Sequence, residues 1–252
     1  MPIAGIGLHV IFAALCAIHV VRSRQPLYWL FILFAFPMIG SLVYFFAVYL
    51  PDSRLQRGAM RAVSAAARAI DPTRELREAR SAFEDTPNTD NRMRLAAALL
   101  ELGDAAAAVD HYRACLAGPL ASDPDIMLSL ARALVESQRY PEALDSLERL
   151  RRDQPDFRCE AVSLLIARSL AGNARNAEAR QEFESAMARF GTYEAKAEYA
   201  IWAWAVGDRS TAEQLDVDLD RISSRWNALT RSLNEPVQRR LLAARQLANR
   251  RS

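Results

Sequence analysis

Cysteine, histidine and lysine are scarce in this 252-residue sequence, and their scarcity excludes several kinds of site. The three cysteines, Cys16, Cys115 and Cys159, show neither CxxC spacing nor the spacing of zinc ligands. A disulfide between Cys115 and Cys159 stays open as an alternative, but reduced, partly buried thiols fit the sequence better. We therefore predict no metal and no cofactor.

Catalytic motifs are also missing. The sequence has no Gly-rich phosphate loop and no nucleophile motif, and its carboxylates are spread over helix faces, where they are normally solvated. The net charge of +2, without a dense basic cluster, argues against nucleic acid as a partner. Lys196 is the single lysine, which we attribute to the codon usage of the source genome rather than to chemistry. These observations predict a protein that is not an enzyme.

Charged side chains are nearly absent from residues 1–50, where only Arg22 and Arg24 occur. Apolar runs at residues 3–21 and 27–50 flank these arginines. At about 1.5 Å per residue, each run is long enough to cross a hydrocarbon core of about 30 Å. A cleaved signal peptide is disfavoured because a basic n-region is missing and a second apolar run follows directly. Residues 1–50 therefore predict a two-helix transmembrane hairpin.

Small and polar residues fall at matching depth in the two expected membrane helices. Small residues let membrane helices approach closely, and a neighbouring helix can satisfy a backbone acceptor freed by proline. We expect His9 to donate or accept a hydrogen bond with Ser41 or Tyr44, rather than to bind haem or metal. The residues expected to pack the hairpin are Gly5, Gly7, His9, Pro37, Gly40, Ser41 and Tyr44.

The second apolar run carries a P-x-x-G-x-x-x-Y pattern, Pro37 to Tyr44, after the basic turn. This stretch resembles the N-terminal membrane domain of phospholipase D-type cardiolipin synthases, over about the first fifty residues. The family's active site uses two H-x-K-x-x-x-x-D motifs, and no such motif exists here, since His111 is followed by Tyr112 and Arg113. The resemblance implies a shared anchor without the enzyme.

A basic amphipathic helix is expected over residues 51–71. Arg54, Arg57, Arg61 and Arg68 form one stripe at helical spacing. The stripe either contacts anionic lipid headgroups or is solvated, with the opposite side packed on the next domain. Counting arginines beside the spans places both ends of the hairpin in the cytoplasm of a bacterium, at its inner membrane, with a periplasmic orientation as the alternative.

Residues 72–252 contain a repeat. Segments that begin at Leu95, Leu130, Ile166 and Tyr199 align at spacings of 33 to 36 residues. They resemble the tetratricopeptide repeat, which implies an all-α solenoid of helix–turn–helix units. We expect about four repeats, an orphan helix over residues 72–85 and a C-terminal capping helix. The small positions of the two helices are Ala96, Ala131, Ala167 and Ala200, then Ala108, Ala143, Ala179 and Ala212.

Turn and helix-start residues are expected to follow the repeat. We place the first and last turns at Gly103 and Gly207, the second at Gln138, and the third at Gly172-Asn173-Ala174. Prolines 124, 141 and 236 are expected in the first turns of their helices, with the capping helix over residues 237–249. Asp216 stands where the fourth repeat should carry a large residue, a departure from the family pattern.

The first helices of such arrays line a concave groove that binds peptides or protein segments. Arg132 and Arg168 occupy equivalent positions. They would pair with an acidic ligand or a C-terminal carboxylate, or else be solvated or bridge to Glu101 and Glu136. Trp204 is either a hydrophobic anchor for a partner or core beneath the capping helix. The residues predicted to line the groove are Met93, Glu101, Leu128, Arg132, Glu136, Leu164, Arg168, Ile201 and Trp204.

Together these features predict a membrane-anchored scaffold or adaptor that binds proteins at the bacterial inner membrane. The alternative is an accessory regulator of a phospholipid-synthesising enzyme, recruited through the hairpin. The identity of the partner and the oligomeric state stay open.

Overall fold

The computed structural model describes residues 71–250. The predicted hairpin of residues 1–50 and the arginine stripe of the connector lie outside the described residues. The chain divides into two units, one ending at Arg74 and the other beginning at Glu75, and the second unit contains nearly all of the described residues. Over residues 71–250, no helix is both long enough and apolar enough to span a bilayer.

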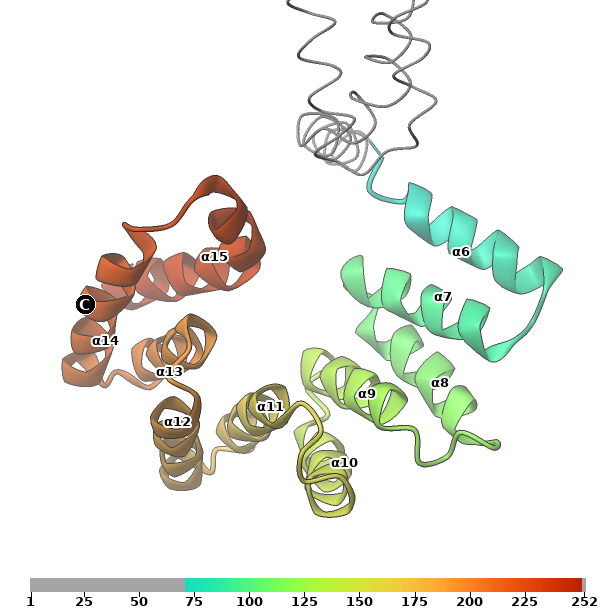
Figure 1. The fold of residues 1–252 in the computed structure, drawn as a ribbon, viewed down its shortest axis with the longest axis horizontal. Helices are drawn as coiled ribbons and strands as arrows, with labels where there is room; N and C mark the ends of the chain where they lie inside the picture. Colours follow the sequence, from blue (N-terminus) through green and yellow to red (C-terminus); the bar gives the residue numbers. More distant parts are fainter. Residues whose placement is uncertain (1–70, 251–252) are drawn as a thin grey trace, which may run out of the picture. The chain divides into compact units, whose positions relative to one another are not determined.

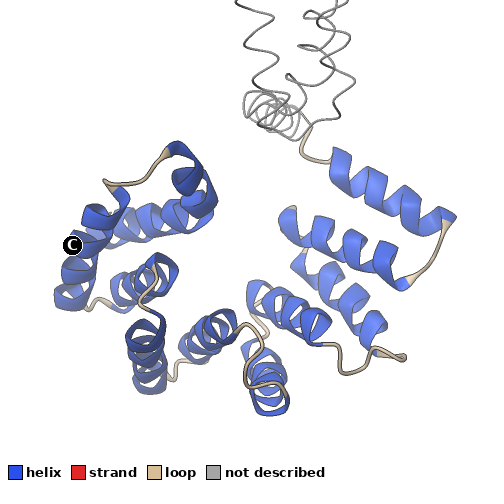
Figure 2. Ribbon diagram, in the orientation of Figure 1, coloured by secondary structure: helices blue, strands red, loops and turns tan. Residues whose placement is uncertain are grey.

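All regular secondary structure in the described part of the chain is α-helical (Figure 2). The ten helices are α6 (Arg74–Asp85), α7 (Thr89–Glu101), α8 (Ala105–Leu116), α9 (Pro124–Glu136), α10 (Tyr140–Asp153), α11 (Cys159–Gly172), α12 (Asn176–Phe190), α13 (Tyr193–Val206), α14 (Arg209–Ser223) and α15 (Ala228–Arg250).

The helices from α7 to α14 form four helix–turn–helix pairs that follow one another in chain order (Figure 1). Each helix packs mainly on its neighbours along the chain, and α15 packs on α13. Before the first pair, α6 buries Ala79 completely and places Phe83 edge-on against His111, with ring centroids 5.9 Å apart. The prediction of a helical solenoid of about four repeats, with one further helix at each end, is therefore confirmed.

The alanines that define the repeat lie in the core of the array. All eight have no exposed surface: Ala96, Ala131, Ala167, Ala200, Ala108, Ala143, Ala179 and Ala212. A larger side chain at these positions would push the helices apart, because protein interiors are close-packed. Large residues such as Leu147 and Phe183, at most 1% exposed, fill the space between successive repeats.

The turn inside each repeat contains one residue in the left-handed backbone region. These residues are Gly103 (φ 86°), Gln138 (φ 60°), Ala174 (φ 59°) and Gly207 (φ 82°). The next residue closes the helix with an N–H to a carbonyl five residues back, such as Asp104 to Leu99 at 2.9 Å. The same turn is thus built four times, twice without glycine.

The third turn lies at Gly172-Asn173-Ala174, as the sequence predicts, but Gly172 is not its left-handed residue. The left-handed position of the third turn belongs to Ala174. Instead, a Cβ atom at Gly172 would meet the ring of Tyr140 at 2.5 Å. Gly172 therefore allows the aromatic ring of the preceding repeat to lie directly on the backbone of α11.

Two kinds of N-cap residue precede the second helix of a repeat, and only the aspartates form a side-chain cap hydrogen bond. In the first and fourth repeats an aspartate accepts the backbone N–H three residues on, at 3.2 Å for Asp104 and for Asp208. In the second and third repeats an arginine occupies the N-cap position and forms an ion pair with the glutamate three residues on. Arg139 donates from Nε to Glu142 at 2.7 Å, and Arg175 donates from Nε to Glu178 at the same distance.

Proline at the start of a helix is confirmed for Pro124 and Pro141, and it is wrong for Pro236. The last helix begins eight residues earlier, at Ala228, where Asn227 accepts the N–H of Thr230 at 2.8 Å. Pro236 lies inside α15 and has no N–H to donate, so the carbonyl of Ser232 lacks its usual helical partner. Sequence reasoning failed because proline is normally found in the first turn of a helix.

Candidate functional site

An open pocket of about 570 Å³ lies along α9, α11, α13 and α15, with Tyr140 of α10 and Phe183 of α12 also in its lining. Most of its lining is apolar, and α15 provides one wall. The apolar residues that line it are Val135, Tyr140, Ala171, Gly172, Phe183, Ile201, Trp202, Trp204, Ala205, Ala243, Ala244, Leu247 and Ala248. We call this space the groove pocket. Pockets of this size and composition are suited to one or two apolar side chains of a ligand.

Two ion pairs lie in the wall of the groove pocket. Arg168 of α11 donates from Nη2 to Glu136 of α9 at 2.8 Å, and thereby links two adjacent repeats. Arg240 of α15 donates to both carboxylate oxygens of Glu198, whose side chain is 5% exposed. A buried carboxylate is stable only when it is paired, so this contact fixes the position of α15 against α13.

Phe183 and Trp202, which line the pocket, form an aromatic cluster with Tyr199, which does not line it. The rings of Phe183 and Tyr199 stack at 5.7 Å, and the ring of Trp202 lies 5.8 Å from each. The guanidinium of Arg180 lies 5.2 Å from the Trp202 ring centroid. This cluster holds this part of the pocket rigid, because each ring is packed on two others.

Trp204 belongs to the core rather than to the open surface. It is 9% exposed, and its indole N–H donates to Asp216 at 3.1 Å. The same carboxylate lies 2.7 Å from Nε of Arg245 in α15. Asp216 departs from the family pattern because here the position supports a tryptophan and the last helix instead of a following repeat.

The remaining predicted residues divide by exposure. Leu128 and Leu164 are each 4% exposed and serve the core. Met93 is half-buried, whereas Glu101 and Arg132 are exposed. None of these five residues lines the groove pocket, which brings together only Glu136, Arg168, Ile201 and Trp204 of the predicted set.

Arg132 differs from its repeat equivalent Arg168, since no residue between 71 and 250 forms an ion pair with it. It lies near two groups whose pKa it affects. Burial raises the pKa of Tyr112, and Arg132 opposes that rise. Burial, followed by the negative charges of Glu198 and Glu160, raises the pKa of Glu194, and Arg132 again opposes it.

Sequence reasoning missed the contribution of α15 to the site. Arg240, Ala244 and Leu247 recur at helical spacing, and this periodicity is a signal that could have pointed to a groove-facing side. The importance of Glu198 was not visible, because a glutamate in an alanine-rich helix is usually solvated.

The described cysteines are free thiols, Cys115 buried and Cys159 partly exposed. Burial raises the pKa of the Cys115 thiol. Over residues 71–250, no group of histidine, cysteine, aspartate or glutamate side chains is arranged to hold a metal ion.

These features define an all-helical solenoid of the described residues that is similar to tetratricopeptide arrays. Residues 99–168, from the end of α7 into α11, match the family model described as "Tetratricopeptide repeat". The match covers the second repeat, α9 and α10, and parts of the first and third repeats. No curated protein matches the chain. Repeats of this family typically mediate protein–protein interaction, and this indicates a binding role for the array.

Proposed function

We propose that the protein is a membrane-anchored scaffold that binds a segment of a partner protein in the groove pocket. The observation that carries the proposal is the composition of the pocket, an apolar space with two ion pairs in its wall. An apolar side chain of the partner fits between Ile201, Ala205 and Leu247. Polar groups of the same segment reach Arg168 and Glu136. The proposal assigns no catalytic role.

The anchoring part of the proposal is supported by the sequence. The apolar runs at residues 3–21 and 27–50 are long enough to span a bilayer, and arginines follow them at residues 54–68. We place the array on the cytoplasmic side of a bacterial inner membrane, with the arginine stripe at anionic headgroups.

Two leucines of α15 offer a matched test. Leu247 lines the groove pocket and is 54% exposed, whereas Leu242, on the same helix and 53% exposed, does not line it. Partners are crosslinked in cells to the full-length protein and identified after purification from membranes. Leu247→Asp is expected to lose a partner that Leu242→Asp retains, because only the first change places a charge in the apolar pocket. Equal recovery of every partner with both variants would contradict binding in this pocket.

The alternative function rests on a different observation, the P-x-x-G-x-x-x-Y pattern of residues 37–44. An accessory regulator recruited through the hairpin would keep its partner in the Leu247→Asp variant. It would lose that partner when Gly40 is replaced by leucine, because the larger side chain separates two packed membrane helices. The two variants therefore distinguish the two functions.

A further inference from the structure

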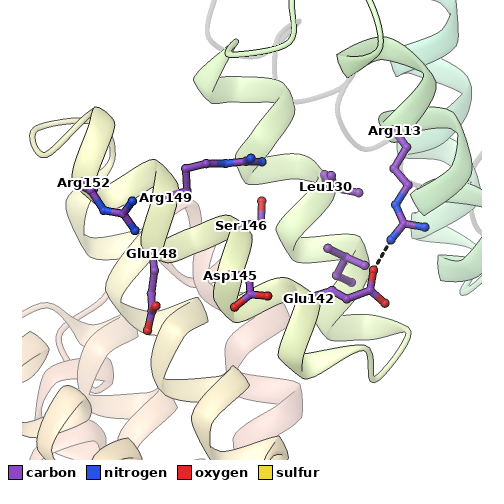
Figure 3. A pocket seen from close by; sticks show the side chains of 9 residues that line it. Arg113, Leu130, Glu142, Asp145, Ser146, Glu148, Arg149 and Arg152 are labelled. Carbon is purple, nitrogen blue, oxygen red and sulfur yellow. Dashed lines mark hydrogen bonds and ion pairs between the residues drawn. The ribbon is translucent and has the colours of Figure 1, made fainter.

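A second pocket, of about 470 Å³, lies between the second helices of the first two repeats, α8 and α10. It shares no lining residue with the groove pocket. Its floor is apolar and well buried, with Leu130 8% and Leu134 2% exposed. Three arginines line it, Arg113 from α8 and Arg149 and Arg152 from α10 (Figure 3). We call it the arginine pocket.

Ser146 lies in the arginine pocket and is 8% exposed. Within residues 71–250 its hydroxyl has no hydrogen-bond partner, although a buried serine in a helix commonly bonds a carbonyl of the preceding turn. Ser169 of α11 does so, donating to Leu165 at 2.7 Å. In Figure 3 the Ser146 hydroxyl is turned toward the guanidinium of Arg149. The residue is largely buried but its oxygen is not fully enclosed, so the hydroxyl is available to a ligand in the pocket.

The arginines of the pocket are only partly neutralised. Arg113 forms an ion pair with Glu142, but that carboxylate is already held by Arg139, whose Nε lies 2.7 Å from it. Arg149 and Arg152 form no ion pair with any residue that the structure describes. Each guanidinium has five N–H donors, so most donors in the pocket are unused.

Acidic side chains of the pocket lie apart from the serine. In Figure 3 the carboxylates of Asp145 and Glu148 point away from the side on which Arg149 and the Ser146 hydroxyl are drawn. The third carboxylate of the pocket, Glu142, is paired with Arg113, so the unpaired donors beside Ser146 are those of Arg149. The donor side, above an apolar floor, is suited to an anion.

We propose that the arginine pocket binds a phosphate monoester group. Its three terminal oxygens and charge of about −1.5 to −2 match two guanidinium forks and one hydroxyl better than a carboxylate does. Arg149 and Arg113 hold the phosphate oxygens, and the hydroxyl of Ser146 donates to one of them. The site is independent of partner binding in the groove pocket.

The test titrates the full-length protein with two soluble probes, glycerol 3-phosphate and dihexanoyl phosphatidic acid, by calorimetry. Dihexanoyl phosphatidylcholine, a phosphodiester, is the control. Tighter binding of the phosphatidic acid assigns the group to a lipid headgroup, and tighter binding of glycerol 3-phosphate assigns it to a soluble metabolite. Binding should strengthen from pH 5 to pH 7, because the second pKa of a phosphate monoester is about 6. No saturable binding of either probe, or equal binding at both pH values, would overturn the proposal.

Variants of α10 locate the site. Arg149→Gln is expected to raise the Kd at least tenfold and Ser146→Ala about threefold, with unchanged circular dichroism, because a charged hydrogen bond contributes more than a neutral one. Arg151 supplies the matched control, since it lies on the same helix, is 45% exposed and pairs with Glu182 outside the pocket. Arg151→Gln should change the Kd less than twofold. A similar loss of affinity in Arg149→Gln and Arg151→Gln would show that only the overall charge of the helix matters.

Discussion

The repeated turn makes a quantitative prediction at three small residues. Gly103 and Ala174 occupy the same left-handed position in different repeats, with φ of 86° and 59°. Gly118 lies in a loop without positive φ, and neither Gly103 nor Gly118 would bring an added Cβ within 4 Å of another atom. The changes Gly103→Ala, Ala174→Gly and Gly118→Ala therefore isolate the effect of backbone conformation from that of packing.

Two opposing terms set the expected magnitude. A residue with a Cβ in the left-handed region costs about 1–2 kcal/mol relative to the right-handed region. Replacing glycine by alanine recovers about 0.4–1 kcal/mol, because the unfolded chain has less freedom. Gly103→Ala should thus lower the free energy of unfolding by about 1 kcal/mol, and Ala174→Gly should raise it by a similar amount. Gly118→Ala should raise it slightly, by about 0.7 kcal/mol.

The global measurement is denaturant unfolding followed by far-ultraviolet circular dichroism. Repeat arrays can unfold in parts, so hydrogen exchange at the amides of Asp104 and Arg175 provides the local measurement. These amides close the two turns at 2.9 Å, to Leu99 and Leu170 respectively. If Gly103→Ala and Gly118→Ala have equal effects, or if Ala174→Gly lowers stability, the left-handed backbone does not limit the stability of these turns.

Three further predictions concern other residues. Gly172→Ala should lower the free energy of unfolding, measured with denaturant, by about 1–3 kcal/mol, because the added Cβ would meet the Tyr140 ring at 2.5 Å. In a Tyr140→Ala background the same change should not lower the free energy of unfolding. Iodoacetamide should modify Cys159, at the start of α11, well before Cys115, because Cys115 is buried and its thiol pKa is raised. Equal modification rates of the two cysteines in peptide mass spectrometry would contradict this. The pKa of Asp208 lies below its ordinary value of 3.8, chiefly because the Thr211 hydroxyl donates a hydrogen bond to its carboxylate. The ionised carboxylate therefore stabilises the fold above pH 3.8, and this stabilisation is lost as the pH falls through the lower pKa of the folded state. Asp208→Asn should reduce the loss of unfolding free energy between about pH 4 and lower pH, because asparagine does not titrate. An unchanged pH dependence would contradict a role for the Asp208 carboxylate.

The phase of the repeat could be predicted because small residues at helix contacts have no substitute. Ala131 and Ala143 are fully buried in the second repeat, and their equivalents in the other three repeats are too. A bulky side chain there would separate the helices of a pair, so a small residue must recur at these positions of the sequence. Helix number and order then follow, because each helix packs on its neighbours along the chain.

Departures from the pattern were harder to interpret. Asp216 looked like a sign that the fourth repeat was degenerate, yet the repeat is complete and its aspartate supports Trp204 and Arg245. Pro236 looked like a helix start, yet it lies within α15. In both cases the explanation lies in α15, whose position against α13 is not encoded by the repeat.

The sequence by itself determined the array: where each helix pair begins, which alanines lie between helices, and which segments follow one another. Local spacing is enough for these features, since they depend on contacts between neighbours in the chain. Only the tertiary structure decided the site. Glu198 meets Arg240 across 42 residues, and Arg168 meets Glu136 across 32. Such pairs depend on how closely and at what angle distant helices approach, and that geometry comes from the packing of the whole array rather than from any local pattern.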